Sequence, residues 1–235
     1  MIKNKNKTKI WILNSIQMFE GLSLSQKSNL LNAIKEVKYN KNEIVFQVGD
    51  KMDQVYFIAQ GRVKIIKMNN DEKETIKRIL NSGDYFGEFS IIDPEKFISF
   101  KDTAKVMDAD TICFSLPSEL FMQVCEEHSF VFQSLLKNIV ANYIKLDSRL
   151  DSVMMRKSKM RIVDFIEEMA EDIGTPVGYD VLIKHNLTHQ DMANITGISR
   201  QKVTTILNEF KQEGLIHLER NTILVHDKRL FQEAV

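Results

Sequence analysis

The chain has 235 residues, 43% of them hydrophobic, and its 32 Lys and Arg residues balance its 32 Asp and Glu residues. This length fits one large domain or two modest ones, and a zero net charge confines any nucleic-acid-binding surface to a local patch. No apolar run could span a membrane, and the two cysteines, Cys113 and Cys125, argue against a disulfide framework and an iron–sulfur cluster, so we expect a cytoplasmic protein with no membrane partner.

Residues 1–117 are predicted to form a β-roll with a helix in front of it. Residues 22–37 have the apolar spacing of a helix, with Ser23 or Ser25 as its N-cap. Further along, runs of β-branched and aromatic residues recur about every ten residues between turn signals. The runs are EIVFQV, QVYFIA, VKIIKM, ETIKRIL, TAKVM and DTICFSL. This spacing predicts an N-terminal antiparallel β-roll of the cupin-like jelly-roll type in an α+β protein.

Residues 118–153 are predicted to form a long helix with an apolar seam. The seam residues follow one another at alternating steps of four and three: Phe132, Leu136, Ile139, Tyr143, Leu146, Leu150 and Val153. One heptad of this kind is typical of a helix packed on its own core. A seam of this length, with polar residues on the other faces, favours a pair of helices, and the simplest partner is the same helix of a second copy.

Residues 154–235 are predicted to form helices followed by strands. A helix is expected from about Met155 to Glu171, and a hairpin near the end is expected to turn at Asn221-Thr222. Between them, THQDMANIT and RQKVTTILNEFKQ read as two short helices joined by Gly197, which permits a tight turn with positive φ. Thr188 and Ser199 are candidate N-caps for the two helices, and Gly214 ends the second.

This pattern predicts a winged helix-turn-helix, in which the first turn of the second helix enters the major groove of DNA. The residues expected to face the bases or flank them are Arg200, Gln201, Lys202, Thr204 and Thr205. Arg can bond guanine and Gln can bond adenine with two hydrogen bonds each. Thr188, His189 and Ser199 suit phosphate contacts at the helix N-termini. A helical hairpin with a polar face remains the alternative interpretation.

Four segments in this order resemble the CRP/FNR family of transcription regulators over nearly the whole chain. They are VGDKMDQVYFIAQGRVKI, NSGDYFGEFSII, the heptad helix and THQDMANITGISRQKVTTIL. The resemblance implies a cyclic-nucleotide-type roll, a dimer helix and a DNA-reading domain on a symmetric operator. Many members have Glu where Gln201 stands and some have Arg where Thr205 stands, so we expect a different half-site.

The resemblance also implies an effector pocket, and here the chain departs from the cAMP-binding pattern. The residues that fall on the pocket are Gly87, Glu88, Phe89, Ser90, Asp102, Thr103 and Leu146. Gly87 and Glu88 keep the turn, whereas Asp102 occupies the place of the phosphate-binding Arg. Two unit charges about 4 Å apart interact by about 4 kcal/mol at an effective dielectric near 20, so the reversed sign is expected to abolish phosphate binding. Leu146 and Asp147 also fail to reproduce the hydroxyl pair that contacts adenine.

The effector is therefore not expected to be cAMP, and the lack of an N-terminal cysteine cluster argues against an iron–sulfur sensor. Haem is left as an open alternative, with His128, Met122, Cys113 and Cys125 as the available ligand types. A redox switch of the two cysteines is disfavoured by their apolar surroundings. Four phenylalanines crowd the segment, and the simpler interpretation is that they fill the roll interior. They are Phe86, Phe89, Phe97 and Phe100.

The sequence thus predicts a homodimeric, non-enzymatic regulator that binds double-stranded DNA at an inverted repeat, with RNA polymerase as a further candidate partner. No phosphate-binding loop, metal-ligand spacing or nucleophile–base pair points to an enzyme. The alternative is a sensor subunit that acts on a partner protein through the roll.

Overall fold

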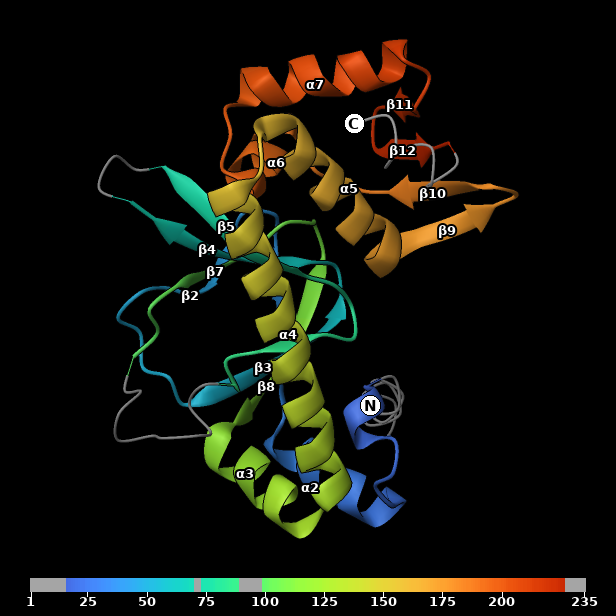
Figure 1. Cartoon of the computed structure of the whole chain (residues 1–235). Coiled ribbons are helices and arrows are strands. Elements are labelled where there is room, and N and C mark those ends of the chain that lie inside the picture. Colours follow the sequence, from blue (N-terminus) through green and yellow to red (C-terminus); the bar gives the residue numbers. More distant parts are fainter. Residues whose placement is uncertain (1–15, 70–72, 89–98, 227–235) are drawn as a thin grey trace. The chain divides into compact units, whose positions relative to one another are not determined.

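The computed structural model describes residues 16–69, 73–88 and 99–226 (Figure 1). The chain divides into two compact units, 1–141 and 142–235. The first unit contains two four-stranded antiparallel sheets. One has the order β1-β8-β3-β6 and comprises Lys35–Tyr39, Thr111–Pro117, Gln54–Gln60 and Tyr85–Phe86. The other has the order β2-β7-β4-β5 and comprises Ile44–Phe46, Thr103–Val106, Val63–Met68 and Glu74–Leu80. The predicted antiparallel roll is confirmed.

The helices of the first unit pack on the outer face of the sheet that contains β3 and β8. They are η1 (Gln17–Phe19), α2 (Leu24–Ala33), α3 (Ser118–Glu127) and the first half of α4 (Ser129–Met155). Phe57 of β3 and Phe114 of β8 point into this helical layer, where Phe57 lies 5.8 Å from Phe121 of α3 between ring centroids. The other face of these strands contributes Ile58 and Cys113 to a second core with residues of the opposite sheet. The alternation of side chains along β3 and β8 thus builds both cores.

Two helix predictions in this unit were wrong in extent. The helix expected over residues 22–37 ends at Ala33, because Lys35–Tyr39 pairs with β8 along its full length. Its N-cap is Ser23, whose hydroxyl accepts from the Gln26 amide in a capping box. The helix expected over 118–153 is interrupted at His128, which has extended backbone and separates α3 from α4. The strands β1 and β6 were not predicted.

The second unit contains the end of α4, α5 (Ser158–Ile173), α6 (His189–Thr196), α7 (Arg200–Gln212) and a sheet of the order β11-β12-β10-β9. The strands are Ile216–Glu219, Thr222–Val225, Asp180–Lys184 and Gly174–Val177. The helix expected from Met155 is α5 and begins at Ser158, while α4 extends to Met155. The wing turns at residues 220–221, one position before the predicted Asn221-Thr222.

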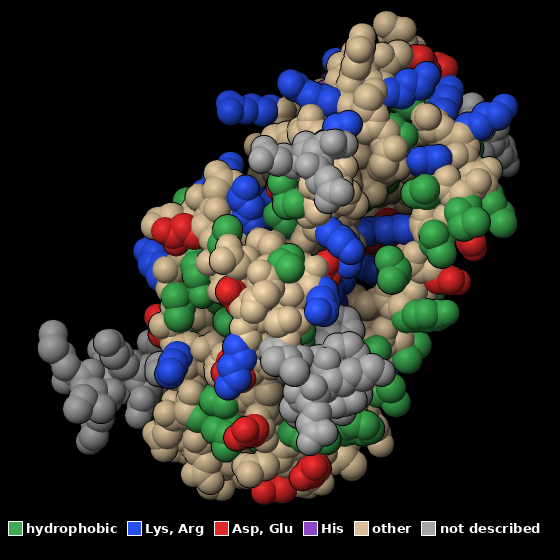
Figure 2. All heavy atoms as spheres, turned by 90° about the vertical axis from the view of Figure 1, so that its left-hand side faces the viewer, with side chains coloured by type: hydrophobic (Ala, Val, Ile, Leu, Met, Phe, Trp, Pro, Cys, Tyr) green, Lys and Arg blue, Asp and Glu red, His purple; other side chains and the backbone are tan. Residues whose placement is uncertain are grey.

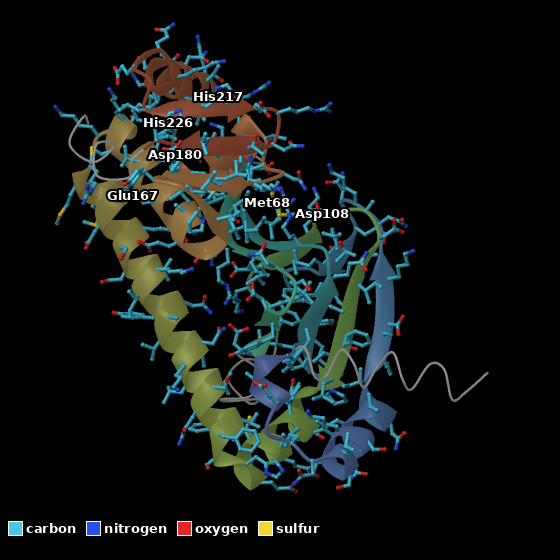
Figure 3. The ribbon with its side chains drawn as sticks, turned by 90° about the vertical axis from the view of Figure 1, so that its right-hand side faces the viewer. Met68, Asp108, Glu167, Asp180, His217 and His226 are labelled. Atoms are coloured by element: carbon cyan, nitrogen blue, oxygen red, sulfur yellow. The ribbon has the colours of Figure 1, made fainter. Side chains whose placement is uncertain are left out.

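The β9–β10 hairpin was not predicted, and it extends the wing into a four-stranded sheet. Its turn contains Gly178 at φ 65°, a left-handed backbone conformation that favours glycine. His226, directly after β12, lies against Asp180 of β10, with 2.9 Å between Nδ1 and Oδ2 (Figure 3). This contact fixes the end of the wing to the start of β10.

Candidate nucleic-acid interface and sensor pocket

The two helices of the predicted DNA reader begin and end at the expected residues. The Thr188 hydroxyl accepts from the Asp191 amide, and the Asp191 carboxylate accepts from the Thr188 amide, which closes a capping box at the start of α6. Gly197 ends α6 at φ 69°. The Ser199 hydroxyl accepts from the Lys202 amide and caps α7. Both helix N-termini are therefore capped by side chains of the reader itself.

The angle between α6 and α7 is filled by apolar residues. Ala193, Val203 and Ile206 are buried, and Ile198 is half-buried beside the turn. A small side chain at position 193 lets the helices approach closely. Burial of this face leaves the first turn of α7 turned outward.

The outward face of α7 consists of polar side chains. Ser199, Arg200, Gln201, Lys202 and Thr205 are exposed. In Figure 2, Lys and Arg side chains gather at the upper end, over this unit. A positive, hydrogen-bonding helix surface of this kind matches the phosphate and base edges of DNA.

Besides the caps Thr188 and Ser199, three more of the predicted contact residues have side-chain hydrogen bonds within the reader. His189 Nδ1 lies 2.8 Å from the Thr204 hydroxyl, which also donates to the Arg200 carbonyl. The Thr205 hydroxyl donates to the Gln201 carbonyl. His189 and Thr204 thus bridge α6 and α7, a pairing that the sequence did not predict because the two positions are 15 residues apart.

The turn of the predicted sensor pocket requires glycine. Gly87 has φ 89°, and a Cβ at this position would lie 2.6 Å from the Gln54 carbonyl oxygen. The backbone therefore approaches β3 more closely than any other residue allows. Phe89, Ser90 and Phe97 lie outside the described residues.

Glu88 forms an ion pair that the sequence analysis missed. Its side chain is 3% exposed, and its Oε1 lies 2.9 Å from Nη1 of Arg78 on β5. Oε2 is buried and has no hydrogen-bond partner among the described residues. Arg78 therefore pairs with the carboxylate that, by the family resemblance, would bind a ribose hydroxyl.

Asp102 is also paired, and this corrects the electrostatic argument made from sequence. Lys77 Nζ lies 2.7 Å from one oxygen of Asp102 and 2.9 Å from the other. The estimate of about 4 kcal/mol of repulsion treated Asp102 as an isolated anion. Lys77 neutralises that charge, so repulsion alone does not exclude a phosphate.

An irregularity in β5 places the side chains of Lys77 and Arg78. Ile65 pairs with Arg78 and Ile66 pairs with Ile76, so Lys77 is an additional residue opposite that step. A β-bulge changes the direction of the side chains around it. A register shift is not visible in one strand alone, so Lys77 and Arg78 were not predicted as partners of the pocket carboxylates. The available signal was two adjacent cations in a run that otherwise predicts a strand.

Aromatic rings fill the described part of the roll interior. Phe46 stacks on Phe100 with ring centroids 3.5 Å apart, and Phe86 lies 5.7 Å from Phe46 and 5.2 Å from Tyr56. Phe86 and Phe100 are buried, as the simpler interpretation of the sequence predicts. Thr103 is half-buried, while Leu146 is exposed on α4.

The predicted seam of α4 is exposed. Phe132, Leu136, Tyr143, Leu146, Leu150 and Val153 are between 45% and 65% exposed, whereas Ile139 packs partly against the first core. The helix is fixed to that core by Val131 and Leu135 on another face. In Figure 2 hydrophobic side chains run down the right-hand edge, along α4. An apolar row of this length on one helix is typical of a surface that pairs with another chain.

The candidate haem and redox residues do not lie in one core. Cys113 belongs to the core between the sheets and Cys125 to the helical core. Burial raises the pKa of the Cys113 thiol to about 12 and, together with Glu126, that of Cys125 to about 11. His128 Nε2 lies 3.1 Å from Gln26 Nε2, and Met122 packs against the helical core. The structure does not bring these four side chains together.

None of the helices within the described residues has the length and apolar character needed to cross a membrane.

Two family models match the chain: the cyclic nucleotide-binding domain over residues 36–128 and the Crp-like helix-turn-helix domain over residues 160–234.

Relatives and solved structures match nearly the whole chain. A CRP-like cAMP-activated global transcriptional regulator of Mycobacterium tuberculosis is 26% identical over 95% of this chain and 98% of its own. The global nitrogen regulator of a Nostoc species is 23% identical over 80% and 83%. Among solved structures, FixK2 from Bradyrhizobium japonicum has a TM-score of 0.73 at 16% identity, covering 85% of this chain and 96% of that one. A CooA mutant from Carboxydothermus hydrogenoformans has a TM-score of 0.74 at 21% identity, covering 88% and 89%. With both domain models in the family's order and regulators as relatives over almost its full length, the chain belongs to the CRP/FNR family of DNA-binding transcription regulators.

Proposed function

We propose that this chain is a homodimeric regulator that reads an inverted repeat with α7 of each copy. The observation that carries this proposal is the exposed, capped first turn of α7, with Arg200, Gln201 and Lys202 projecting from a well-packed helix pair. This surface is polar and positive, whereas the apolar face of α7, with Val203, Ile206 and Leu207, is buried. Base contacts by Arg200 and Gln201 and a phosphate contact by Lys202 follow from their chemistry.

The second copy is the occupant proposed for the α4 seam. The exposed apolar residues of the seam all lie on one face of α4. A two-fold dimer joined at this face would present its two reading helices to successive major grooves. Tyr143→Glu puts a charge in the middle of this interface. We expect the dimer dissociation constant, measured by sedimentation, to rise at least about tenfold. Gln133→Glu adds the same charge on another face of α4 and is the matched control.

Operator binding is tested with Arg200→Ala. An operator is first selected from random DNA with the wild-type chain, and its affinity is measured over a salt series. We expect the variant to lose about 1–3 kcal/mol of binding, most of it at one base position. Lys211→Ala, at the far end of α7, removes a charge without reaching the groove and is the control. An unselective, salt-independent association would contradict the proposal, and intact binding by Arg200→Ala would favour the sensor-subunit alternative.

We further propose that the roll does not respond to cAMP. Both β5 cations are engaged by carboxylates, so a cyclic nucleotide would have to break the Arg78–Glu88 pair to reach Glu88. Titration calorimetry with cAMP is expected to show no binding and no change in operator affinity. Saturable cAMP binding that strengthens operator binding would overturn this part alone.

A further inference from the structure

The second half of α4 is attached to α5 by a row of polar contacts, which we name the polar ladder. Its rungs are Lys145–Asp172, Arg149–Glu168 and Ser152–Asp164. From one rung to the next, the residue number rises along α4 and falls along α5, so the two helices run antiparallel. All six residues belong to the second compact unit.

The middle rung has the geometry of a strong contact. Arg149 donates from Nε to Glu168 Oε2 at 3.0 Å and from Nη2 to Oε1 at 2.7 Å. Both side chains are mostly buried, at 28% and 21% exposure. Bidentate, partly desolvated pairs are stronger and more directional than exposed ones. The Lys145–Asp172 rung is more exposed and contributes less.

Two more contacts close the end of the ladder. Arg161 of α5 donates from Nη2 to the Val153 carbonyl at 2.7 Å and from Nε to the Arg156 carbonyl at 3.2 Å. A cation on the last carbonyls of a helix satisfies groups that have no intrahelical partner. Arg156 also lies 3.4 Å from Asp164. The short connection between α4 and α5 is thereby held from both sides.

The contacts described between this part of α4 and α5 are polar. Between residues 142 and 155 the one buried residue is Ser152, and the large apolar side chains there are exposed. The opposite face of α5 is apolar and contributes Ile162, Phe165 and Ile166 to the core of the reader. The ladder and the Arg161 contacts thus connect the second half of α4 to the helix that packs in the reader.

We propose that the polar ladder is a positioning element that sets the direction of α7 relative to the seam and thereby selects the half-site spacing. This inference rests on the proposed function, in which two copies joined at the seam read one inverted repeat. A dimer can occupy both half-sites only when its two reading helices are held at the separation of the grooves. Arg149 and Glu168 touch no DNA in this role and act through the placement of α5.

The test compares the wild-type chain with Arg149→Glu, Glu168→Arg and the double charge swap. Each is measured on the selected operator, on operators with the spacer changed by single base pairs, and on one half-site. We expect Arg149→Glu to bind the selected operator about tenfold more weakly, to lose its spacing preference and to bind the half-site unchanged. The double swap is expected to restore the spacing preference.

Lys137→Glu, a charge reversal on α4 outside the ladder, is the matched control, and light scattering confirms the dimer in each sample. An equal loss on half-site and full operator, a wild-type spacing profile, or no rescue by the swap would each overturn the inference. If Arg149→Glu does not fold, Glu168→Gln retains the shape without the charge and gives the same readout with a smaller change. Failure of the wild-type chain to bind any operator would instead reject the proposed function.

Discussion

The ion pair between Arg78 and Glu88 gives the sharpest prediction for the roll. Arg78→Met removes the guanidinium and leaves the Glu88 carboxylate, 3% exposed, without its partner. Breaking a buried pair from one side costs about 3–5 kcal/mol, because the remaining charge stays desolvated. Since Arg78 itself is 22% exposed and water can partly replace it, we expect a loss near the lower limit, about 3 kcal/mol.

The assay is native-state hydrogen exchange, because two compact units make one global unfolding midpoint hard to interpret. Peptides from β3 and β8 should lose about 3 kcal/mol of protection, while α6 and α7 remain unchanged. Lys77→Met is the neighbouring control: its pair with Asp102 is more exposed, so we expect a loss of at most about 1 kcal/mol. The double variant Arg78→Met/Glu88→Gln should recover most of the loss. Protection in Arg78→Met within about 0.5 kcal/mol of wild type would refute the reasoning.

Three further predictions concern a helix cap, a pH dependence and the thiols. Thr188→Ala removes the cap of α6 and should lower the hydrogen-exchange protection of α6 and α7 by about 1 kcal/mol, whereas Thr188→Ser should be close to neutral. Hydrogen bonds from Arg62 hold the pKa of Asp108 below its usual range. The resulting stability is present above the unfolded pKa of about 4 and is lost as pH falls through the lowered folded pKa, so Asp108→Asn should flatten the acid limb of roll stability. Because burial raises the pKa of Cys113 to about 12 and of Cys125 to about 11, iodoacetamide at neutral pH should label both thiols slowly until denaturant is added.

Each of these has a result that would contradict it. Equal stability of the Thr188 alanine and serine variants would mean that the cap does not contribute. If the loss of roll stability at low pH is the same in Asp108→Asn as in the wild type, the Arg62–Asp108 pair does not cause it. Fast alkylation of the native chain would show that the two cores open readily.

Patterns with strong local causes were predictable from the sequence. The six runs of strand residues and the caps at Thr188 and Ser199 depend on side-chain alternation and on hydroxyls at helix starts, which are visible without tertiary structure. β1 was not predictable in the same way, because its pairing with β8 joins segments some 75 residues apart and overrides a helical pattern.

The candidate sensor site shows the same limit more clearly. Gly87 and Glu88 were recognised from a local turn, but the partners of Glu88 and Asp102 lie on another strand. A register shift in β5 places Lys77 and Arg78 there, and register is a property of paired strands. The pairing of His189 with Thr204 was missed for a similar reason, because it depends on the angle between two helices.

The continuity of α4 has a consequence for how insertions would act on this chain. The seam begins on the part of α4 that packs in the first core and continues on the part that carries the ladder, with no break in the helix. Each residue of an α-helix advances its side chain by about 100° around the axis. One residue inserted between Ile139 and Tyr143 would therefore move the second half of the apolar row a quarter-turn or more out of phase with the first, whereas seven inserted residues would nearly restore it. The alignment of the two halves of the apolar row therefore depends on the number of residues between them as well as on the identity of the seam residues.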